Sequence, residues 1–439
     1  MSLKQTILKG TVILTLTSFC TRFMGFFYRI FLSHTFGEEN IGLYQLVFPI
    51  YALGCSISCA GVQLALSRCV ARHTACGEPQ KAKELLKTSL IFTFGLSCVL
   101  TMFLQHYANF ISTHLLHDAR CTPLLILLSY TFPFASIHSC ICGYSLGLKG
   151  TKIPAISQLI EQASRILFVF LLYLYTSKQG ISASIVLAIA GLTAGEIFAS
   201  LYSLMTIFGM PLHLPATVLS FRSFSTHLLE LIQHALPLTT SRVLLNILQS
   251  IEAVSIPLSL QHYGFSISES LKIYGVMTGM ALPCILFPSA ITNAVSSMLL
   301  PTIAEMQAKQ HRQNLRPVIS RITCYCIFLG SAFCVLLLLS GNWLGSFLFH
   351  SSLAADFILS LAWICPFLYT NTVLLSIING LGKTFFSFIA NFTSLCIRIM
   401  GVFFFIPRFG IPGYLNGLLV SQIVLFLLCR LQLFLYLHD

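Results

Sequence analysis

The chain has 439 residues, of which 56% are hydrophobic and only 9% are charged, and its mean hydropathy is +0.85. A soluble domain carries about 25% charged residues, so this composition excludes an ordinary soluble protein and predicts an integral membrane protein. The formal net charge of +12 could indicate nucleic-acid binding. We attribute it instead to membrane topology and expect no nucleic-acid partner, because the basic residues gather in loops on one side of the predicted membrane.

Hydrophobic segments separated by short polar loops predict an all-α polytopic membrane protein. A membrane-spanning helix needs about 20 apolar residues, and a span with its loop takes roughly 35, so about 12 transmembrane helices fit the chain. The predicted spans cover residues 6–33, 41–66, 88–110, 122–145, 154–176, 181–206, 228–260, 271–299, 322–342, 357–379, 386–407 and 413–436.

Two arginines lie inside the first predicted span, in the segment TSFCTRFMGFFYRIFL. Arg22 and Arg29 are seven residues apart, almost two helical turns, so both project from one helix face. Ser18 and Gly25 extend that face as small and polar. A charged side chain at bilayer depth costs at least about 2.5–3.5 kcal/mol, so we expect the two arginines to face a water-filled cavity that binds an anion. The alternative is a shorter span whose arginines snorkel to the interface.

The distribution of lysine and arginine predicts the orientation of the chain. All but four basic residues of the predicted loops lie on one side, and the four exceptions are Arg120, Lys178, Lys272 and Arg408. The positive-inside rule then places both termini in the cytoplasm of a multi-pass protein of the cell (plasma) membrane. The predicted outer loops are too short to form an extracytoplasmic domain.

Weak internal repetition predicts two lobes. A shift of about 233 positions places Arg165 on Arg398 together with several neighbouring matches. We expect an N-terminal six-helix lobe at 1–206, a cytoplasmic linker at 207–227 and a C-terminal six-helix lobe at 228–439. Internal repeats with a site at their interface are typical of transporters.

A polar ribbon runs along the seventh predicted span. Thr239, Arg242, Asn246 and Gln249 recur at i, i+3, i+7 and i+10, which places them on one helical face. We expect this face to line the cavity from the second lobe, and the alternative is a buried polar seam that holds helices together. The predicted substrate-binding residues are therefore Ser18, Arg22, Arg29, Arg242, Asn246 and Gln249.

The acidic residues inside the spans have two expected roles. Glu161 and Arg165 are four residues apart with the acid first, the favourable order for an intrahelical pair, so we expect a structural ion pair. Glu196 and Glu252 are candidate sites for a coupling cation, Na⁺ or H⁺, although a buried acid can also be protonated or paired. Arg398 has no acid one turn away, and the sequence leaves open whether it faces lipid phosphate or the cavity.

No catalytic or cofactor motif is evident. The chain has no zinc-protease helix motif, glycine-rich phosphate loop, nucleophile elbow or paired carboxylates. Its 16 cysteines show no ligand spacing and predict neither a disulfide framework nor a zinc site. The 13 histidines fall mostly in loops and at helix ends, and we expect none to cluster with acids. We therefore expect no enzymatic activity, no cofactor and no metal site.

Four segments resemble a known family. They are TRFMGFFYR, FGEENIGLYQLVFPIY, ALPLTTSR and LLPTIAE, and they resemble stage V sporulation protein B and related polysaccharide-export proteins of the MOP superfamily. That superfamily includes lipid II flippases and MATE drug exporters. The resemblance implies a two-lobed, V-shaped, alternating-access transporter. It also implies that Arg22, Arg29 and Arg242 hold the diphosphate of a polyprenyl-linked sugar. Some lipid II flippases have two helices more than this chain is predicted to have.

The function expected from these observations is a flippase. It would move a polyprenyl-diphosphate-linked saccharide, such as lipid II or a related cell-wall or polysaccharide precursor, across the lipid bilayer from the cytoplasmic to the outer leaflet. A cationic cavity would lower a barrier that amounts to tens of kcal/mol for an isolated ion. The alternative is a MATE-type multidrug or cation antiporter. Cationic drugs require a carboxylate in the cavity, and the first span offers arginines and no acid.

Overall fold

The computed structural model describes residues 3–180, 183–209, 220–308 and 312–438. Every regular element within these ranges is helical, which confirms the predicted all-α class. The α-helices are α1 (Leu3–Cys55), α2 (Gly61–Ala75), α3 (Pro79–Phe110), α4 (Cys121–Ser129), α5 (Thr131–Gly147), α6 (Lys152–Lys178), α7 (Val186–Gly209), α8 (Phe221–Tyr263), α9 (Ile267–Gly275), α10 (Leu282–Leu286), α11 (Ser289–Ala308), α12 (Arg312–Trp343), α13 (Ser352–Ala362), α14 (Cys365–Gly380), α15 (Thr384–Met400), α16 (Ile406–Phe409) and α17 (Ile411–His438). Short π-helical turns lie at Ser56–Ala60, Ile111–Leu115, Val276–Ala281, Leu344–Leu348 and Gly401–Phe405.

The described helices include nine that are long and apolar enough to cross a membrane, or up to 11 if each of two bent helix pairs counts as one span. The run Val12–Ala75 has 64 residues, far more than the roughly 20 that one crossing needs. It is interrupted at Gly37, whose φ of 77° and ψ of 169° are not helical. Glycine adopts this positive φ at no steric cost, and the break falls between the predicted spans 6–33 and 41–66. The protein is therefore a multi-pass membrane protein, and the exact number of spans stays a prediction.

The chain forms two compact units, each built from two stretches of sequence. Unit 1 comprises Met1–Gly25 and Leu46–Ser250, and unit 2 comprises Phe26–Gln45 and Ile251–Asp439. The middle of α1 therefore packs with the C-terminal half of the chain. The predicted lobes 1–206 and 228–439 stay predictions, and residues 210–219 of the predicted linker lie outside the described residues.

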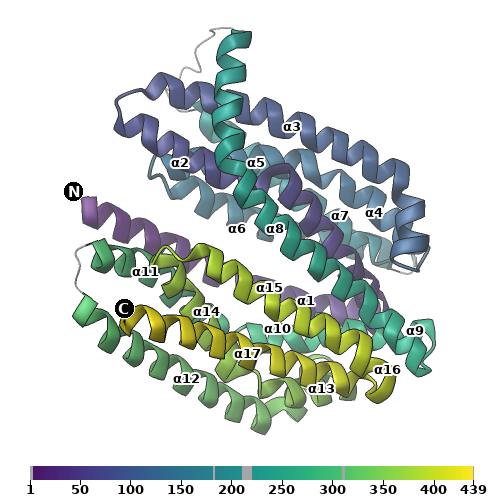
Figure 1. Ribbon diagram of the computed structural model, residues 1–439. Helices are drawn as coiled ribbons and strands as arrows, with labels where there is room; N and C mark the ends of the chain where they lie inside the picture. Colours follow the sequence, from purple (N-terminus) through teal and green to yellow (C-terminus); the bar gives the residue numbers. More distant parts are fainter. Residues whose placement is uncertain (1–2, 181–182, 210–219, 309–311, 439) are drawn as a thin grey trace. The chain divides into compact units, whose positions relative to one another are not determined.

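Unit 1 is held together by an apolar core between α2, α3 and α5, which run side by side (Figure 1). Leu66, Leu85 and Ile141 are fully buried in this core. Gly143 and Gly147 of α5 lie against the backbone of α2, where a β-carbon would collide with Gln63 or Val70 and their neighbours. These glycines allow the close helix approach on which the core depends.

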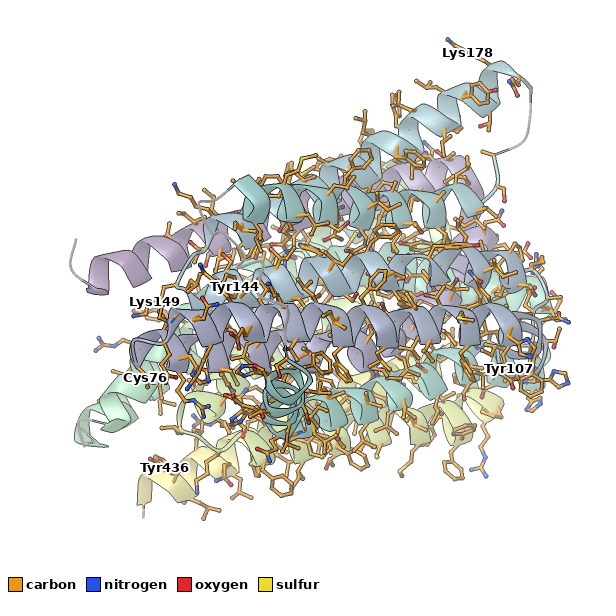
Figure 2. The ribbon with its side chains drawn as sticks, turned by 90° about the horizontal axis from the view of Figure 1, so that it is seen from above. Cys76, Tyr107, Tyr144, Lys149, Lys178 and Tyr436 are labelled. Atoms are coloured by element: carbon orange, nitrogen blue, oxygen red, sulfur yellow. The ribbon has the colours of Figure 1, made fainter. Side chains whose placement is uncertain are left out.

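Figure 2 shows how the ends of unit 1 are arranged. Cys76, in the turn between α2 and α3, and Lys149, in the turn between α5 and α6, lie at the same end of the unit. Tyr107 and Lys178 lie at the opposite end. The assignment of these two ends to the cytoplasm and the exterior stays a prediction.

Unit 2 has a corresponding apolar core between α11, α12, α14 and α17. Leu374 and Ile377 are fully buried there. Asn371 of α14 donates to the backbone and side-chain carbonyls of Gln422 on α17, at 2.9 and 3.0 Å. Large apolar side chains also cover the outside, such as Leu339, which is 83% exposed. Such a surface suits lipid contact and would be unfavourable in water.

Candidate functional site

The three arginines of the predicted cavity are divided between the two units. Arg22 on α1 and Arg242 on α8 belong to unit 1, and both side chains are exposed. Arg29 belongs to unit 2, where it is half-buried and its Nη1 donates to the Thr278 carbonyl at 3.4 Å. Each guanidinium keeps its charge under physiological conditions. A shared cavity for these three side chains stays a prediction.

The polar ribbon of α8 is partly used for packing. The Asn246 amide donates to the Ala52 carbonyl at 3.1 Å and to the Ser56 hydroxyl at 2.6 Å, so this residue makes the interhelical contacts expected of a polar seam. Gln249 is exposed, as is Arg242, and Ser18 on α1 is half-buried. Thr239 also packs against Gly61 at the start of α2, so the ribbon combines two packing residues with two exposed side chains, Arg242 and Gln249.

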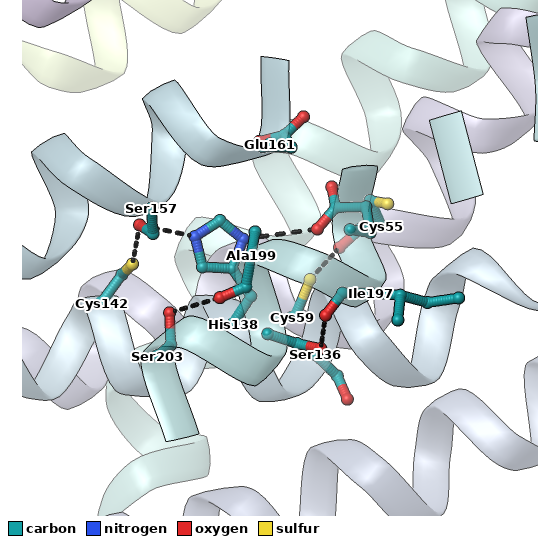
Figure 3. Close-up of polar contacts among 12 residues, drawn as sticks. Cys55, Cys59, Ser136, His138, Cys142, Ser157, Glu161, Ile197, Ala199 and Ser203 are labelled. Carbon is teal, nitrogen blue, oxygen red and sulfur yellow. Dashed lines mark hydrogen bonds and ion pairs between the residues drawn. The ribbon is translucent and has the colours of Figure 1, made fainter. Parts of the chain in front are cut away.

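A buried polar cluster lies where α5, α6 and α7 of unit 1 meet the second half of α1 (Figure 3). The His138 Nδ1 lies 3.3 Å from Glu196 Oε2, and its Nε2 lies 3.0 Å from the Ser157 hydroxyl. The Tyr51 hydroxyl donates to Glu196 Oε1 at 3.1 Å. Glu196 is only 6% exposed, so its carboxylate depends on these partners in place of water.

A second carboxylate belongs to the same cluster. Glu161 on α6 forms an ion pair with the guanidinium of Arg165, as their i, i+4 spacing predicts. One imidazole nitrogen of His138 and one carboxylate oxygen each of Glu161 and Glu196 all lie within 4.8 Å of one another. The expectation that no histidine clusters with acids is therefore wrong. The sequence carries no local signal for His138, because its carboxylate partner is 58 residues away.

Two glycines of α7 explain how the carboxylates come together. A β-carbon on Gly195 would lie 2.7 Å from the Glu161 carbonyl oxygen and 3.3 Å from the Arg165 β-carbon, and one on Gly191 would collide with Val169. The spacing G-L-T-A-G is the small-x-x-x-small pattern that allows membrane helices to approach closely. The approach of α7 to α6 places Glu196 beside Glu161.

Unit 2 contains a different buried cluster around Glu252 of α8, which is 3% exposed. Arg398 Nε and the Tyr414 hydroxyl each donate to Glu252 Oε1 at 2.7 Å. Arg398 therefore has a carboxylate partner, which the sequence had not indicated because the acid lies 146 residues away. The two repeat-related arginines both bind an acid, one within its own helix and one on a distant helix.

A third network joins the start of α8 to the turn between α2 and α3. His73 lies between two carboxylates, with Nδ1 2.8 Å from Glu78 Oε2 and Nε2 3.1 Å from Glu230 Oε1. Arg72 pairs with Glu230, and Lys81 pairs with Glu78. The pKa of Glu78 lies below its usual value, chiefly because the Lys81 ammonium donates a hydrogen bond to its carboxylate. The contact with His73 makes a smaller contribution in the same direction. These contacts dock the start of α8 against α2 and the turn that follows it.

The helical architecture is shared with solved membrane transporters. It has the fold of the MOP superfamily transporters. A MATE family transporter in its inward-facing conformation matches with a TM-score of 0.75 and 15% sequence identity, covering 94% of both chains. A lipid II flippase MurJ in its inward closed conformation matches with a TM-score of 0.73 and 14% identity, covering 96% of this chain and 87% of the flippase.

The particular family follows from the sequence. The profile of the polysaccharide biosynthesis protein family matches residues 7–307, so the chain belongs to that family. It is 27% identical to stage V sporulation protein B of Bacillus subtilis (strain 168), over 97% of this chain and 83% of that protein. It is 22% identical to the lipid II flippase MurJ of the same organism, over 90% of this chain and 76% of the flippase. The resemblance noted from the opening motif is confirmed.

Proposed function

We propose that the protein is an alternating-access flippase of the plasma membrane, with both termini in the cytoplasm. Its substrate would be a polyprenyl-diphosphate-linked saccharide, lipid II or a related cell-wall or polysaccharide precursor, moved from the cytoplasmic to the outer leaflet. The observation that carries the proposal is the presence of arginines within the apolar helices α1 and α8, in a chain whose relatives include a lipid II flippase. The match to the polysaccharide biosynthesis protein family supports a role in making a cell-wall or other polysaccharide, and the similarity to a stage V sporulation protein supports a role in sporulation.

The proposed binding chemistry is the pairing of guanidinium groups with diphosphate. Arginine donates two parallel hydrogen bonds to phosphate oxygens and stays charged in a partly desolvated site. An inside-negative membrane favours outward movement of an anion by about 2.3 kcal/mol per charge per 100 mV, so the potential contributes to export. The residues assigned to substrate binding are Arg22, Arg29 and Arg242, assisted by Ser18, Asn246 and Gln249.

Coupling to a cation, Na⁺ or H⁺, is assigned to the buried acids Glu196 and Glu252. The two acids differ in their surroundings. Glu196 contacts a histidine and a tyrosine, whereas Glu252 is bound by the guanidinium of Arg398. An acid fixed in an ion pair is more suited to a structural role, so the surroundings of Glu196 give the stronger support for coupling.

A MATE-type cation antiporter is the second candidate, favoured by the fold similarity to a MATE transporter. The two functions are distinguished by the charge of the transported molecule. Purified full-length protein in liposomes would be supplied with a labelled polyprenyl-diphosphate disaccharide in the inner leaflet. Appearance of the label in the outer leaflet would be followed with a membrane-impermeant reagent.

The same vesicles, loaded with a cationic dye and given an imposed proton gradient, would test antiport, and protein-free liposomes would correct for leakage. We expect the diphosphate lipid to move much faster than in protein-free liposomes. We expect the rate of dye efflux to equal that of protein-free liposomes. Dye efflux without lipid movement would overturn the flippase proposal.

A further inference from the structure

We infer that His138 is a proton-binding residue of unit 1, and that its imidazole takes up the one positive charge that its buried cluster lacks. Proton binding itself is independent of any transported substrate. The further claim that this proton is the coupling cation rests on the proposed function. The sequence indicated a proton only as one of two candidate coupling cations at Glu196 and Glu252, and neither the sequence nor the comparisons indicated His138.

The hydrogen-bond partners of His138 define where its protons lie. An ionised Glu196 carboxylate can only accept a hydrogen bond, so the Nδ1 that faces Glu196 Oε2 at 3.3 Å is a donor. The Ser157 hydroxyl lies 3.0 Å from Nε2 and 3.1 Å from the Pro154 carbonyl oxygen. A carbonyl oxygen can only accept as well. When the hydroxyl donates to Pro154, it must accept from Nε2, and His138 is then an imidazolium with both nitrogens protonated.

The same atoms also suit the neutral imidazole. If Nε2 loses its proton, rotation of the Ser157 hydroxyl away from Pro154 provides a donor for the bare nitrogen, while Nδ1 continues to donate to Glu196. One proton leaves Nε2, and the Ser157 hydroxyl exchanges its hydrogen bond to the Pro154 carbonyl for one to Nε2. The pocket therefore satisfies both nitrogens in either charge state. A histidine whose protonation state never changed would need hydrogen-bond partners for only one of these states.

The charges around His138 favour the protonated state. The titratable groups that interact with His138 itself are Cys142 from α5, Glu161 from α6 and Glu196 from α7. The groups that interact with the two carboxylates are Tyr51, Cys55 and Cys59 from the second half of α1 and the π-turn after it, and Arg165 from α6. Phenol and thiol groups are neutral near pH 7. Among the residues that the structure describes, two carboxylates therefore face one guanidinium, and with both carboxylates ionised a proton on His138 makes the cluster electrically neutral. Without it, a net negative charge remains buried, which is strongly unfavourable.

The cluster of unit 2 provides an internal comparison. There Glu252 faces one guanidinium, that of Arg398, and one neutral phenol, that of Tyr414. One negative and one positive charge already balance, so this cluster requires no additional cation. The two units thus differ in a way that assigns proton binding to unit 1.

A metal ion is the competing occupant, because the ligand atoms of His138, Glu161 and Glu196 lie within 4.8 Å of one another. A metal ion between them would have to replace the contact of His138 with Glu196, and the Arg165 guanidinium that pairs with Glu161 would repel it. A proton on His138 uses the existing contacts and displaces nothing. The geometry therefore favours the proton.

The direct test is a histidine NMR spectrum of the full-length protein in detergent micelles, with ¹³C-labelled imidazoles. The signal that disappears in His138→Gln identifies the residue, and His106→Gln, at an exposed position, is the matched control. At pH 7 we expect the His138 signal to show the imidazolium form. In Glu161→Gln the cluster is neutral without the proton, so the ratio of imidazolium to neutral imidazole should fall by tenfold or more, as expected for loss of a charge at this distance.

Three outcomes would overturn the inference. A neutral His138 at pH 7, or an unchanged ratio in Glu161→Gln, would show that the residue is not the proton-binding group. A His138 signal that shifts on addition of Na⁺ or Zn²⁺ at millimolar concentration would identify a metal site instead. If His138→Gln does not fold, Glu161→Gln gives the same answer, since the histidine signal that responds to it is then His138.

The coupling claim has its own readout. In the liposome assay, an imposed proton gradient should change lipid movement in the wild type and have no effect in His138→Gln. Lipid movement that is insensitive to the gradient in both proteins would overturn coupling while leaving proton binding intact. Absence of lipid movement altogether would overturn the proposed function and, with it, the coupling claim. The NMR result would still stand.

Discussion

The cluster around Glu252 makes a prediction about stability that can be worked out from its contacts. Arg398 Nε and the Tyr414 hydroxyl share one carboxylate oxygen at 2.7 Å each, and Glu252 is 3% exposed. Glu252→Gln keeps an oxygen acceptor in the same place and removes the charge. The Arg398 guanidinium is then left without a countercharge inside the protein. Removing one partner of a buried ion pair costs about 3–5 kcal/mol.

The Arg398 side chain is 25% exposed and the glutamine amide still offers an oxygen acceptor, so we expect the lower end of that range, about 3 kcal/mol. Tyr414→Phe, which removes one hydrogen bond to a charged acceptor, should cost about 1.5–3 kcal/mol. The assay is chemical unfolding in detergent. The double variant Glu252→Gln with Arg398→Gln should recover part of the loss, because no unpaired charge remains.

An unchanged free energy of unfolding in Glu252→Gln would refute this reasoning, as would strict additivity in the double variant. A variant of normal stability whose lipid movement has lost its dependence on a cation gradient would instead assign Glu252 to coupling. The free energy of unfolding and the gradient dependence of lipid movement, measured on the same variant, therefore distinguish a structural role of Glu252 from a coupling role.

Two further predictions concern helix packing in unit 1. Gly195→Val should separate α7 from α6 and lower the thermal stability by several degrees, measured by unfolding in detergent, since its β-carbon would lie 2.7 Å from the Glu161 carbonyl. Gly95→Ala is the control, because no atom lies within 4 Å of the position that its β-carbon would take, and it should be at least as stable as the wild type. Equal stability of Gly195→Val and Gly95→Ala would contradict the packing account. His73→Gln should loosen the first turns of α8, because the contact with Glu230 is lost. We expect faster backbone hydrogen exchange after residue 223. Unchanged exchange there would show that the network does not dock α8.

The helical class, the family and the Glu161–Arg165 pair could be predicted because they depend on local sequence. Hydropathy and helical spacing report directly on segments of about 20 residues and on neighbours one turn apart. The Gly37 break was also predictable in kind, since the loop between the first two spans was expected there.

The buried clusters were not predictable in full because their partners are far apart in sequence. Glu196 and Glu252 were identified as unusual intramembrane acids, but the partners His138 and Arg398 lie 58 and 146 residues from them. Asn246 shows the opposite difficulty. Its helical spacing suggested a cavity face, and that spacing cannot distinguish a side chain that lines a cavity from one that bonds to Ala52 of a neighbouring helix.

The account depends most on the cationic side chains of α1 and α8. The measurement that tests it most directly is the rate of polyprenyl-diphosphate lipid movement in liposomes for Arg22→Ala and Arg242→Ala. Arg430→Ala, at an exposed position on α17, serves as the control. We predict that each of the first two variants moves the lipid at least tenfold more slowly at normal expression, and that the control moves it at the wild-type rate. Wild-type rates in both Arg22→Ala and Arg242→Ala would contradict the claim that these arginines bind the diphosphate.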